Sequence, residues 1–210
     1  MSTSFHVYPT KESIPTFREL IDVAMVHLRE LLASWGFNQT VPLTVTLWRT
    51  ESDRTSVPAE LDSPFWWPWK GYATFVVPPV GATIAHAHSV DDIDREYIED
   101  ILLKQAPQFA DRASAFLRVG RSWNFVKHAG QPSIIYAAYG MLAGSLAELT
   151  DGFIDSGDCA WDSERLPALP SAFLSAYGRP DPNGSEKHRD WEKYFLERLR
   201  QELSEIQSAQ

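Results

Sequence analysis

Two groups of side chains have the residue types and the spacing to support metal chemistry. The segment "TIAHAH" places His86 and His88 two residues apart, which puts both imidazoles on one face if the segment is a β-strand. The segment "GFIDSGDCAWD" holds the carboxylates Asp155, Asp158 and Asp162, and clustered carboxylates suit Mg²⁺ or Ca²⁺. If the fold brings the two groups together, the chain is a metal-dependent hydrolase, which is one hypothesis for its function.

The same carboxylates have a structural interpretation that needs no metal. Asp155-Ser156-Gly157-Asp158 has the composition of a tight turn, with Asp158 capping the segment that follows. The spacing lacks the calcium-loop pattern of regularly placed acids, a central glycine and a final glutamate. The histidine pair needs a third ligand that only the fold can supply. On balance the sequence predicts no bound metal and no cofactor.

Several absences argue against an enzyme. Cys159 is the only cysteine, so it forms no intramolecular disulfide, and this fits a reducing compartment. Its acidic neighbours disfavour the thiolate that a nucleophile requires, so we interpret it as structural. The chain has no Gly-rich phosphate loop, no Gly-x-Ser-x-Gly elbow and no His-Glu-x-x-His motif. We therefore predict no catalytic residues.

A tryptophan-rich loop indicates recognition. Trp66, Trp67 and Trp69 lie in "SPFWWPWKG", where prolines forbid regular structure and stiffen the loop. Tryptophans held on such a loop are pre-organised anchors for a protein partner or, alternatively, for a small ligand or adaptor function. The competing interpretation is that they cover the hydrophobic core.

An acidic segment indicates what kind of partner would bind. The chain has 19 basic and 28 acidic residues and a net charge of −9, which argues against direct nucleic-acid binding. Five acids, Asp91, Asp92, Asp94, Glu96 and Glu99, lie in one predicted helix. Such a cluster either steers a basic protein partner or is an ordinary solvated helix face. We predict that these acids and the three tryptophans bind the partner.

The elements that must position these residues follow from hydrophobic periodicity. Ser89 with Asp92 resembles a capping box for the acidic helix, and Ile93, Tyr97 and Ile101 are its predicted core face. The pattern predicts helices over 15–35, 91–103, 109–117, 132–150 and 186–206, and strands over 43–48, 72–79, 121–128 and 153–155, with "TIAHAH" continuing the second strand or forming a third.

These elements lack the regular alternation of a parallel α/β fold. The sequence therefore predicts an α+β fold in which a mostly antiparallel sheet packs against several helices. Residues 1–180 are expected to form a single domain, and residues 181–210 a linker and an amphipathic C-terminal helix docked on it. Neither a secretory signal nor an apolar run long enough to span a membrane occurs in the sequence. A cytoplasmic protein is expected.

One segment resembles a known family. In "LAELTDGFIDSGDCAWD" the matching residues lie between 146 and 161, and the resemblance extends from the first helix to about Tyr177. These residues resemble the immunity protein 52 family of bacterial polymorphic toxin systems, with Cys159 standing where glycine is expected. The resemblance implies an α+β immunity protein that binds a cognate nuclease toxin with a restriction-endonuclease-like (Tox-REase-5) domain. It also implies a type VI secretion system and no catalytic residues in this chain.

Overall fold

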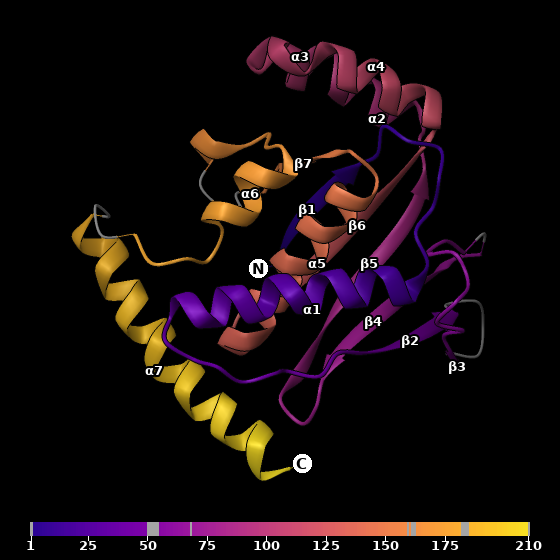
Figure 1. Cartoon of the computed structure of the whole chain (residues 1–210). Coiled ribbons are helices and arrows are strands. Elements are labelled where there is room, and N and C mark those ends of the chain that lie inside the picture. The colour runs from indigo at the N-terminus through magenta and orange to yellow at the C-terminus, as the bar shows by residue number, and fades with distance from the viewer. Residues whose placement is uncertain are drawn as a thin grey trace.

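A single seven-stranded sheet organises the molecule. The computed structural model describes residues 2–49, 55–67, 69–158, 160, 163–181 and 185–209. The strand order is β3-β2-β4-β5-β6-β1-β7, and every pairing is antiparallel. Helices α1, α5 and α6 lie on one face, and a helical cap lies across one end (Figure 1). The predicted α+β fold with an antiparallel sheet and a C-terminal helix is confirmed.

Four strands in succession, β2 to β5, follow the first helix, and the remaining strands are separated by helices of very different length. The strands are β1 (Ser2–Tyr8), β2 (Thr44–Arg49), β3 (Ser56–Pro58), β4 (Gly71–Val77), β5 (Gly81–Ser89), β6 (Arg121–His128) and β7 (Phe153–Asp155). The helices are α1 (Phe17–Ser34), α2 (Asp92–Glu96), the π-helix η1 (Tyr97–Leu102), α3 (Leu103–Gln105), the 3-10 helices η2 (Pro107–Phe109) and η3 (Ser163–Arg165), α4 (Ala110–Val119), α5 (Ser133–Leu149), α6 (Pro170–Ala176) and α7 (Glu186–Ser208). None of the described helices has both the length and the apolar character that a membrane span requires.

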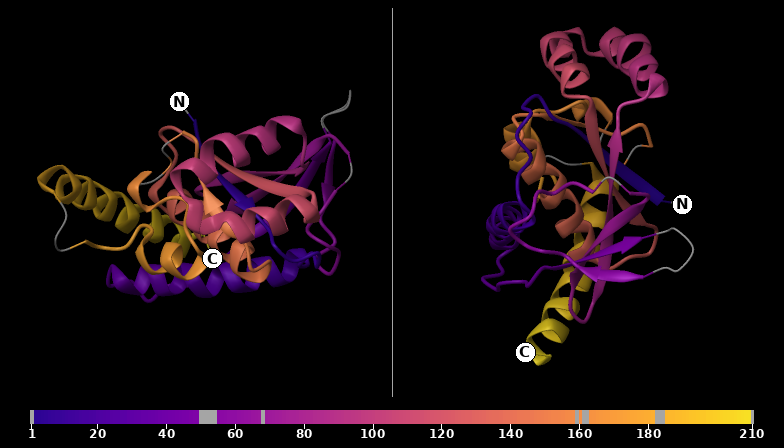
Figure 2. Two further views of the ribbon diagram at one scale, coloured as in Figure 1. Left: turned by 90° about the horizontal axis from the view of Figure 1, so that it is seen from above. Right: turned by 90° about the vertical axis from the view of Figure 1, so that its right-hand side faces the viewer.

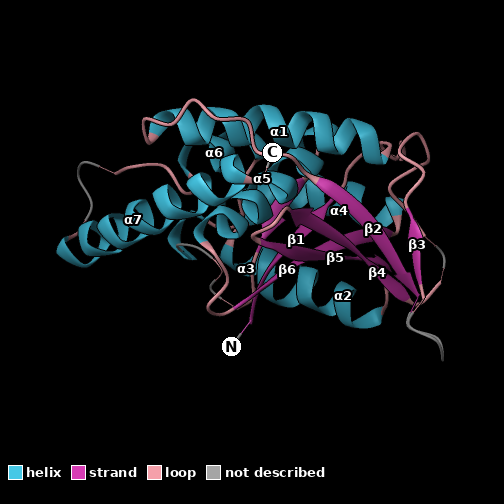
Figure 3. Cartoon of the chain, turned by 90° about the horizontal axis from the view of Figure 1, so that it is seen from below, coloured by secondary structure: helices cyan, strands magenta, loops and turns pink. Residues whose placement is uncertain are grey.

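Alternation along the strands gives the sheet two unlike faces. Phe5, Phe75 and Phe125 are fully buried on the inner face, which packs on α5. Their neighbours in sequence, such as His6 and Asn124, are only partly buried on the outer face. Figure 3 shows α1 and α5 on one side of the strands and the cap helices α2 and α3 on the other. A sheet covered over one face and only part of the second is typical of antiparallel architecture.

Helix α5 is the centre of the core. Nearly all of its side chains are buried, because it contacts the sheet on one side and α1, α6 and α7 on the others. Gly140 and Gly144 leave room for Tyr177 and Leu174, whose side chains occupy the space that a Cβ would need. The small residues of this helix therefore allow α6 to approach its backbone closely.

The C-terminal helix α7 packs against the main core through one apolar stripe. Phe195, Leu199 and Leu203 are buried in the same hydrophobic cluster as the sheet and α5. Ring contacts join Phe195 to Trp35 of the α1 C-terminus at 5.5 Å and to Tyr136 of α5 at 5.7 Å. The second view of Figure 2 shows α7 extending away from the cap, at the opposite end of the sheet.

The helical cap is formed by residues 91–119, which connect β5 to β6. Ile98, Leu102 and Phe116 pack on Tyr8 of β1 and Phe153 of β7, in a second cluster separate from the main core. Figure 2 shows this cap as a distinct layer beyond the end of the sheet. The cap is thus attached to the outer face at the β1–β7 edge.

Two expectations for the acidic helix are wrong. The N-cap is Asp91, which forms a capping box with Asp94, in place of the predicted Ser89 and Asp92 pair. Ile93 and Ile101 are not on the core face, since they are 75% and 46% exposed. A π-helix widens the turn at 97–102 and shifts the buried stripe to Ile98 and Leu102.

Four elements lie outside the sequence-based prediction, and one of them is the single-turn 3-10 helix η3. Strand β1 occupies the N-terminal segment, where Phe5 and Val7 alternate with polar residues, and it pairs with both β6 and β7. Strand β3 is a short edge strand within the segment expected to be a loop. Helix α6 begins at Pro170, where Pro fits the first turn. β3, η3 and α6 are short, so their periodic signal is weak, whereas the seven residues of β1 do show the alternation of a strand.

Candidate binding surfaces

The histidine pair and the acidic turn lie on different parts of the outer face. His86 and His88 share one face of β5, as predicted, with ring centroids 5.9 Å apart. Pairing across the sheet runs from His86 to Asn124 on β6, to His6 on β1 and to Asp155 on β7. Three strand spacings of about 4.8 Å put His86 roughly 14 Å from Asp155. Metal ligands must lie within about 2.5 Å of one ion, so these residues do not form one metal site.

The described carboxylates of the turn act as hydrogen-bond acceptors within the structure. Asp158 accepts from the backbone N–H and the hydroxyl of Ser4, at 3.0 and 2.7 Å, and from the hydroxyl of Ser156 at 2.9 Å. Asp155 accepts from the hydroxyl of Tyr97. Among the described residues, no group of three His, Cys, Asp or Glu side chains is arranged to hold a metal ion. Cys159, interpreted as a structural cysteine, and Asp162, the third carboxylate of the predicted cluster, lie outside the described residues.

A continuous cross-strand row crosses the outer face. Trp48 of β2 stacks on Tyr72 of β4 at 6.3 Å, and Tyr72 contacts the His86 ring at 5.8 Å. Oδ1 of Asn124, the next residue in the row, is buried and has no hydrogen-bond partner within the described structure. His6, beside it, was not among the predicted site residues. Only the strand register brings these residues together, and no local sequence motif predicts that register.

The surroundings of the histidines on this face favour the neutral form of each imidazole. Partial burial lowers the pKa of His6, His86 and His88, because the charged imidazolium loses solvation. Asp155 opposes this effect at His6, and Asp94 opposes it at His88. The neighbouring His88 lowers the pKa of His86 further. Neutral imidazoles both donate and accept hydrogen bonds, so the face is polar without being strongly charged.

The tryptophans of the predicted anchor loop are not equivalent. Trp67 is only 2% exposed, and its ring contacts Phe17 and Phe65 in the main core. The prediction that Trp67 contacts a partner is therefore wrong, because its side chain is buried in the core. Trp66 and Trp69 are partly buried, and their rings remain available on the loop surface.

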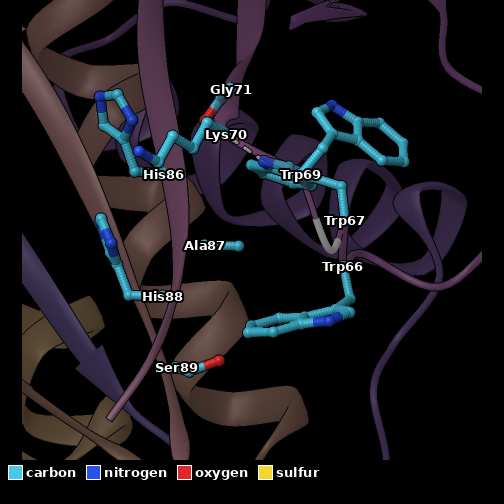
Figure 4. Close-up of a pocket in the computed structure, with 9 residues that line it drawn as sticks. All are labelled: Trp66, Trp67, Trp69, Lys70, Gly71, His86, Ala87, His88 and Ser89. Atoms are coloured by element: carbon cyan, nitrogen blue, oxygen red, sulfur yellow. Dashed lines mark hydrogen bonds between the residues drawn. The ribbon is translucent and has the colours of Figure 1, made fainter. Parts of the chain in front are cut away.

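These two tryptophans line a pocket at the end of the sheet. Its volume is about 430 Å³, and its other walls include Lys70, His86 and His88 (Figure 4). Cations accompany both indoles: Arg49 lies 4.7 Å from the ring centroid of Trp69, and Arg121 lies 5.9 Å from that of Trp66. The tryptophan loop and the histidine pair, predicted as separate features, therefore meet in one cavity.

The acidic helix presents most of its charges to solvent. Asp92, Glu96 and Glu99 are exposed, and within the described part of the chain no ion pair or hydrogen bond engages their carboxylates. Asp91 is exposed and Asp94 partly buried, and both also serve in the capping box. We call residues 91–101 the acidic ridge. It carries six acids and one arginine, a formal charge of −5 out of −9 for the whole chain.

The chain matches no known family model, no curated protein sequence and no solved structure. The resemblance of the 146–161 segment to immunity proteins is therefore an inference from those residues alone. In the structure, residues 146–158 of this segment form the end of α5, strand β7 and the Asp158 turn, which lie at the edge of the sheet beside the cap.

Proposed function

We propose that this chain is an immunity protein that binds and neutralises a secreted antibacterial nuclease in the cytoplasm of the producing cell. The observation that carries the proposal is the acidic ridge with apolar side chains exposed inside it. Ile93, at 75% exposure, is flanked by Asp92 and Glu96, and Ile101 follows Asp100. Exposed apolar side chains within a charged surface are the arrangement of an interface whose apolar contacts have a polar rim.

The chemistry of a nuclease matches this surface. A nuclease cleft is basic because it grips phosphates, so it attracts a concentrated negative charge. Complementary charge raises the association rate, and apolar anchors at the centre of an interface slow dissociation. A ridge with a charge of −5 and two exposed isoleucines provides both contributions.

The ridge is also held rigidly enough to bind without a large ordering cost. The capping box between Asp91 and Asp94 fixes its first turn. Ile98 and Leu102 anchor its inner side in the second hydrophobic cluster, and Tyr97 is bonded to Asp155 of β7. Because pre-organised side chains lose little entropy on binding, this arrangement favours a tight complex.

Co-expression with the product of the neighbouring gene tests the proposal. If that protein is a toxic nuclease, the chain should restore growth, abolish DNA cleavage in vitro and co-elute with the toxin on a sizing column. Ile93→Arg should weaken the complex at least about tenfold, because it places a cation and a mismatched shape in the interface. Val26→Arg is the matched control, since Val26 is an exposed apolar residue on α1, which does not belong to the cap.

Continued cell killing with no complex would refute the proposed function. Equal weakening by the Val26 and Ile93 variants would instead show that the toxin binds a surface other than the ridge. Retained binding by both variants would lead to the same conclusion. The co-expression result therefore tests the immunity function, and the two variants test whether the acidic ridge is the binding surface.

A further inference from the structure

The pocket beside the tryptophan loop exists because two paired strands separate. The pairing of β4 with β5 extends as far as Ala73 and Ala85, whereas β5 continues to Ser89. Before Gly71 the chain turns away into the tryptophan loop, which leaves the edge of β5 beyond Ala85 facing a cavity of about 430 Å³. Pockets that bind small molecules have volumes of roughly 300–1,000 Å³. The space is therefore sufficient for a small ligand.

One side of this pocket is aromatic. Figure 4 shows the rings of Trp66 and Trp67 on opposite sides of Ala87, with Trp69 beyond Trp67. The indole nitrogen of Trp67 donates to the Gly71 carbonyl at 3.3 Å. The indole nitrogen of Trp69, by contrast, is buried and has no acceptor within the described structure. The aromatic side of the pocket therefore consists of indole rings, against which a flat apolar ligand can pack.

The other side of the pocket is basic, although the chain as a whole is acidic. The titratable side chains among the described lining residues are Lys70, His86 and His88, and none of those residues is acidic. Figure 4 shows the Lys70 side chain extending toward His86, on the side of β5 opposite Ala87. Asp91 and Asp94 lie near His88 at the start of the cap, so the cationic group at the other end is the Lys70 ammonium, next to the imidazole of His86.

We infer that this pocket binds a small planar aromatic carboxylate. The aromatic body lies against the indoles on the Ala87 side, and the carboxylate lies toward Lys70 and His86. Aromatic faces are favourable partners for a flat apolar ring, and a charge-assisted hydrogen bond to an ammonium is stronger than one between neutral groups. This site is distinct from the acidic ridge, and its occupancy does not require a toxin.

Direct titration with 2-naphthoate tests the site. We expect saturable binding with a dissociation constant of about 1 mM or lower, the value that a fitting ligand of this size reaches at modest efficiency. The neutral isostere 2-naphthamide should bind at least about tenfold more weakly, because it lacks the charge that Lys70 recognises. In ¹⁵N-labelled protein, the indole N–H resonance that disappears in Trp69→Phe should shift on titration with naphthoate.

Charge variants locate the carboxylate. Lys70→Gln should weaken naphthoate binding by about tenfold and leave naphthamide binding unchanged, because it removes only the charge. Lys104→Gln is the matched control, because Lys104 lies on α3 of the cap and pairs with Asp100 there; its affinity for naphthoate should stay within about twofold of wild type. Thermal melting of each variant identifies any that fails to fold, and Lys70→Arg, which keeps the charge, should bind naphthoate within about threefold of wild type.

Three results would overturn the inference. The first is no saturable binding of naphthoate, and the second is equal affinity for naphthoate and naphthamide. The third is an unchanged affinity for naphthoate in a folded Lys70→Gln variant. None of these measurements involves the toxin, so failure here leaves the proposed immunity function standing, and failure of that function leaves this site standing.

Discussion

The hydroxyl of Tyr97 donates a hydrogen bond to Oδ2 of Asp155 across 2.5 Å, and this bond ties the cap to the edge strand of the sheet. Tyr97 belongs to the π-helix η1 and Asp155 ends β7. Asp155 is only 7% exposed, so its carboxylate depends on such donors for the solvation that it has lost. A carboxylate that resembles a metal ligand in the sequence thus has a structural partner.

Replacing Tyr97 by Phe should destabilise the protein by about 1.5 kcal/mol or more, the usual contribution of a hydrogen bond to a charged group. The variant removes one hydroxyl and leaves the ring packing against the second cluster. Urea denaturation measures the change in the free energy of unfolding. Tyr194→Phe, at an exposed position of α7, should change it by less than about 0.5 kcal/mol. A Tyr97→Phe variant as stable as wild type would contradict this role.

The same bond predicts how stability depends on alkaline pH. Burial, together with the hydrogen bond to Asp155, raises the pKa of Tyr97 well above its ordinary value of 10. Above that value the unfolded chain releases the proton and the native protein keeps it, so stability falls as the pH rises. The slope of unfolding free energy against pH gives the number of protons released on unfolding, and Tyr97→Phe should lower that number by up to about one. Unfolding free energies measured from about pH 9 to pH 11 give the slope.

Acidic pH should destabilise the protein through the histidines of the outer face. Burial lowers the pKa of His86 and His88 below 6.5, so below that pH the unfolded chain binds protons that the native protein does not. Stability should therefore decrease as the pH falls from about 6.5, although Asp94 and Asp91 beside His88 moderate the effect. His86→Gln should flatten the decrease in the urea midpoint, whereas His128→Gln, at an exposed position, should not.

Most helices of this fold are predictable from local sequence, because one turn of helix repeats within four residues. The periodicity of α1 and α7 predicts both helices to within a few residues. The same reasoning fails at the cap, where the extra residue of a π-helix turn shifts the buried stripe from Ile101 to Ile98 and Leu102. A fixed period of 3.6 residues cannot anticipate that shift.

The candidate sites were harder to predict, because they depend on contacts between distant segments. The sequence identifies His86, His88 and the tryptophans as unusual, but only the separation of β4 from β5 brings them around one cavity. His6 pairs with Asp155 across β1 and β7, and no local pattern announces that pairing. Burial of Trp67 likewise follows from its contact with Phe17, on a different element.

A buried carboxylate should fix α7 to the start of α5. Glu202 is 6% exposed and accepts from the backbone N–H groups of Ser133 and Ile134, at 2.9 and 2.8 Å. These donors belong to the first turn of α5 and lack intrahelical acceptors, and the helix dipole favours an anion there. Glu202→Gln should cost about 2 kcal/mol in urea denaturation. Glu205→Gln, at an exposed position, is the control, and equal effects of the two would refute the prediction.

Tight packing at Gly140 should make the smallest substitution harmful. A Cβ at this position would overlap the ring of Tyr177. In an open helix Gly→Ala gains about 1 kcal/mol, but overpacking in a core costs about 1–3 kcal/mol. We expect Gly140→Ala to lower the free energy of unfolding. Gly157→Ala is the control, because no atom lies within 4 Å of an added Cβ there, and its free energy of unfolding should change by less than about 0.5 kcal/mol. A Gly140→Ala variant more stable than wild type would contradict the prediction and show that α6 moves away from α5 at little cost.

Charge reversal on the acidic ridge should slow association with the proposed toxin partner. Replacing Asp92, Glu96 and Glu99 by Lys removes the attraction that steers a basic cleft, so the association rate should fall at least about tenfold at low salt. Its dependence on salt should weaken as well, while the dissociation rate changes less. Stopped-flow fluorescence at two ionic strengths measures these rates. The control carries the same change in charge at exposed acids of α7, namely Asp190, Glu197 and Glu205. If the control slows association as much as the ridge variant, net charge alone steers the toxin, and the ridge has no special part in the encounter.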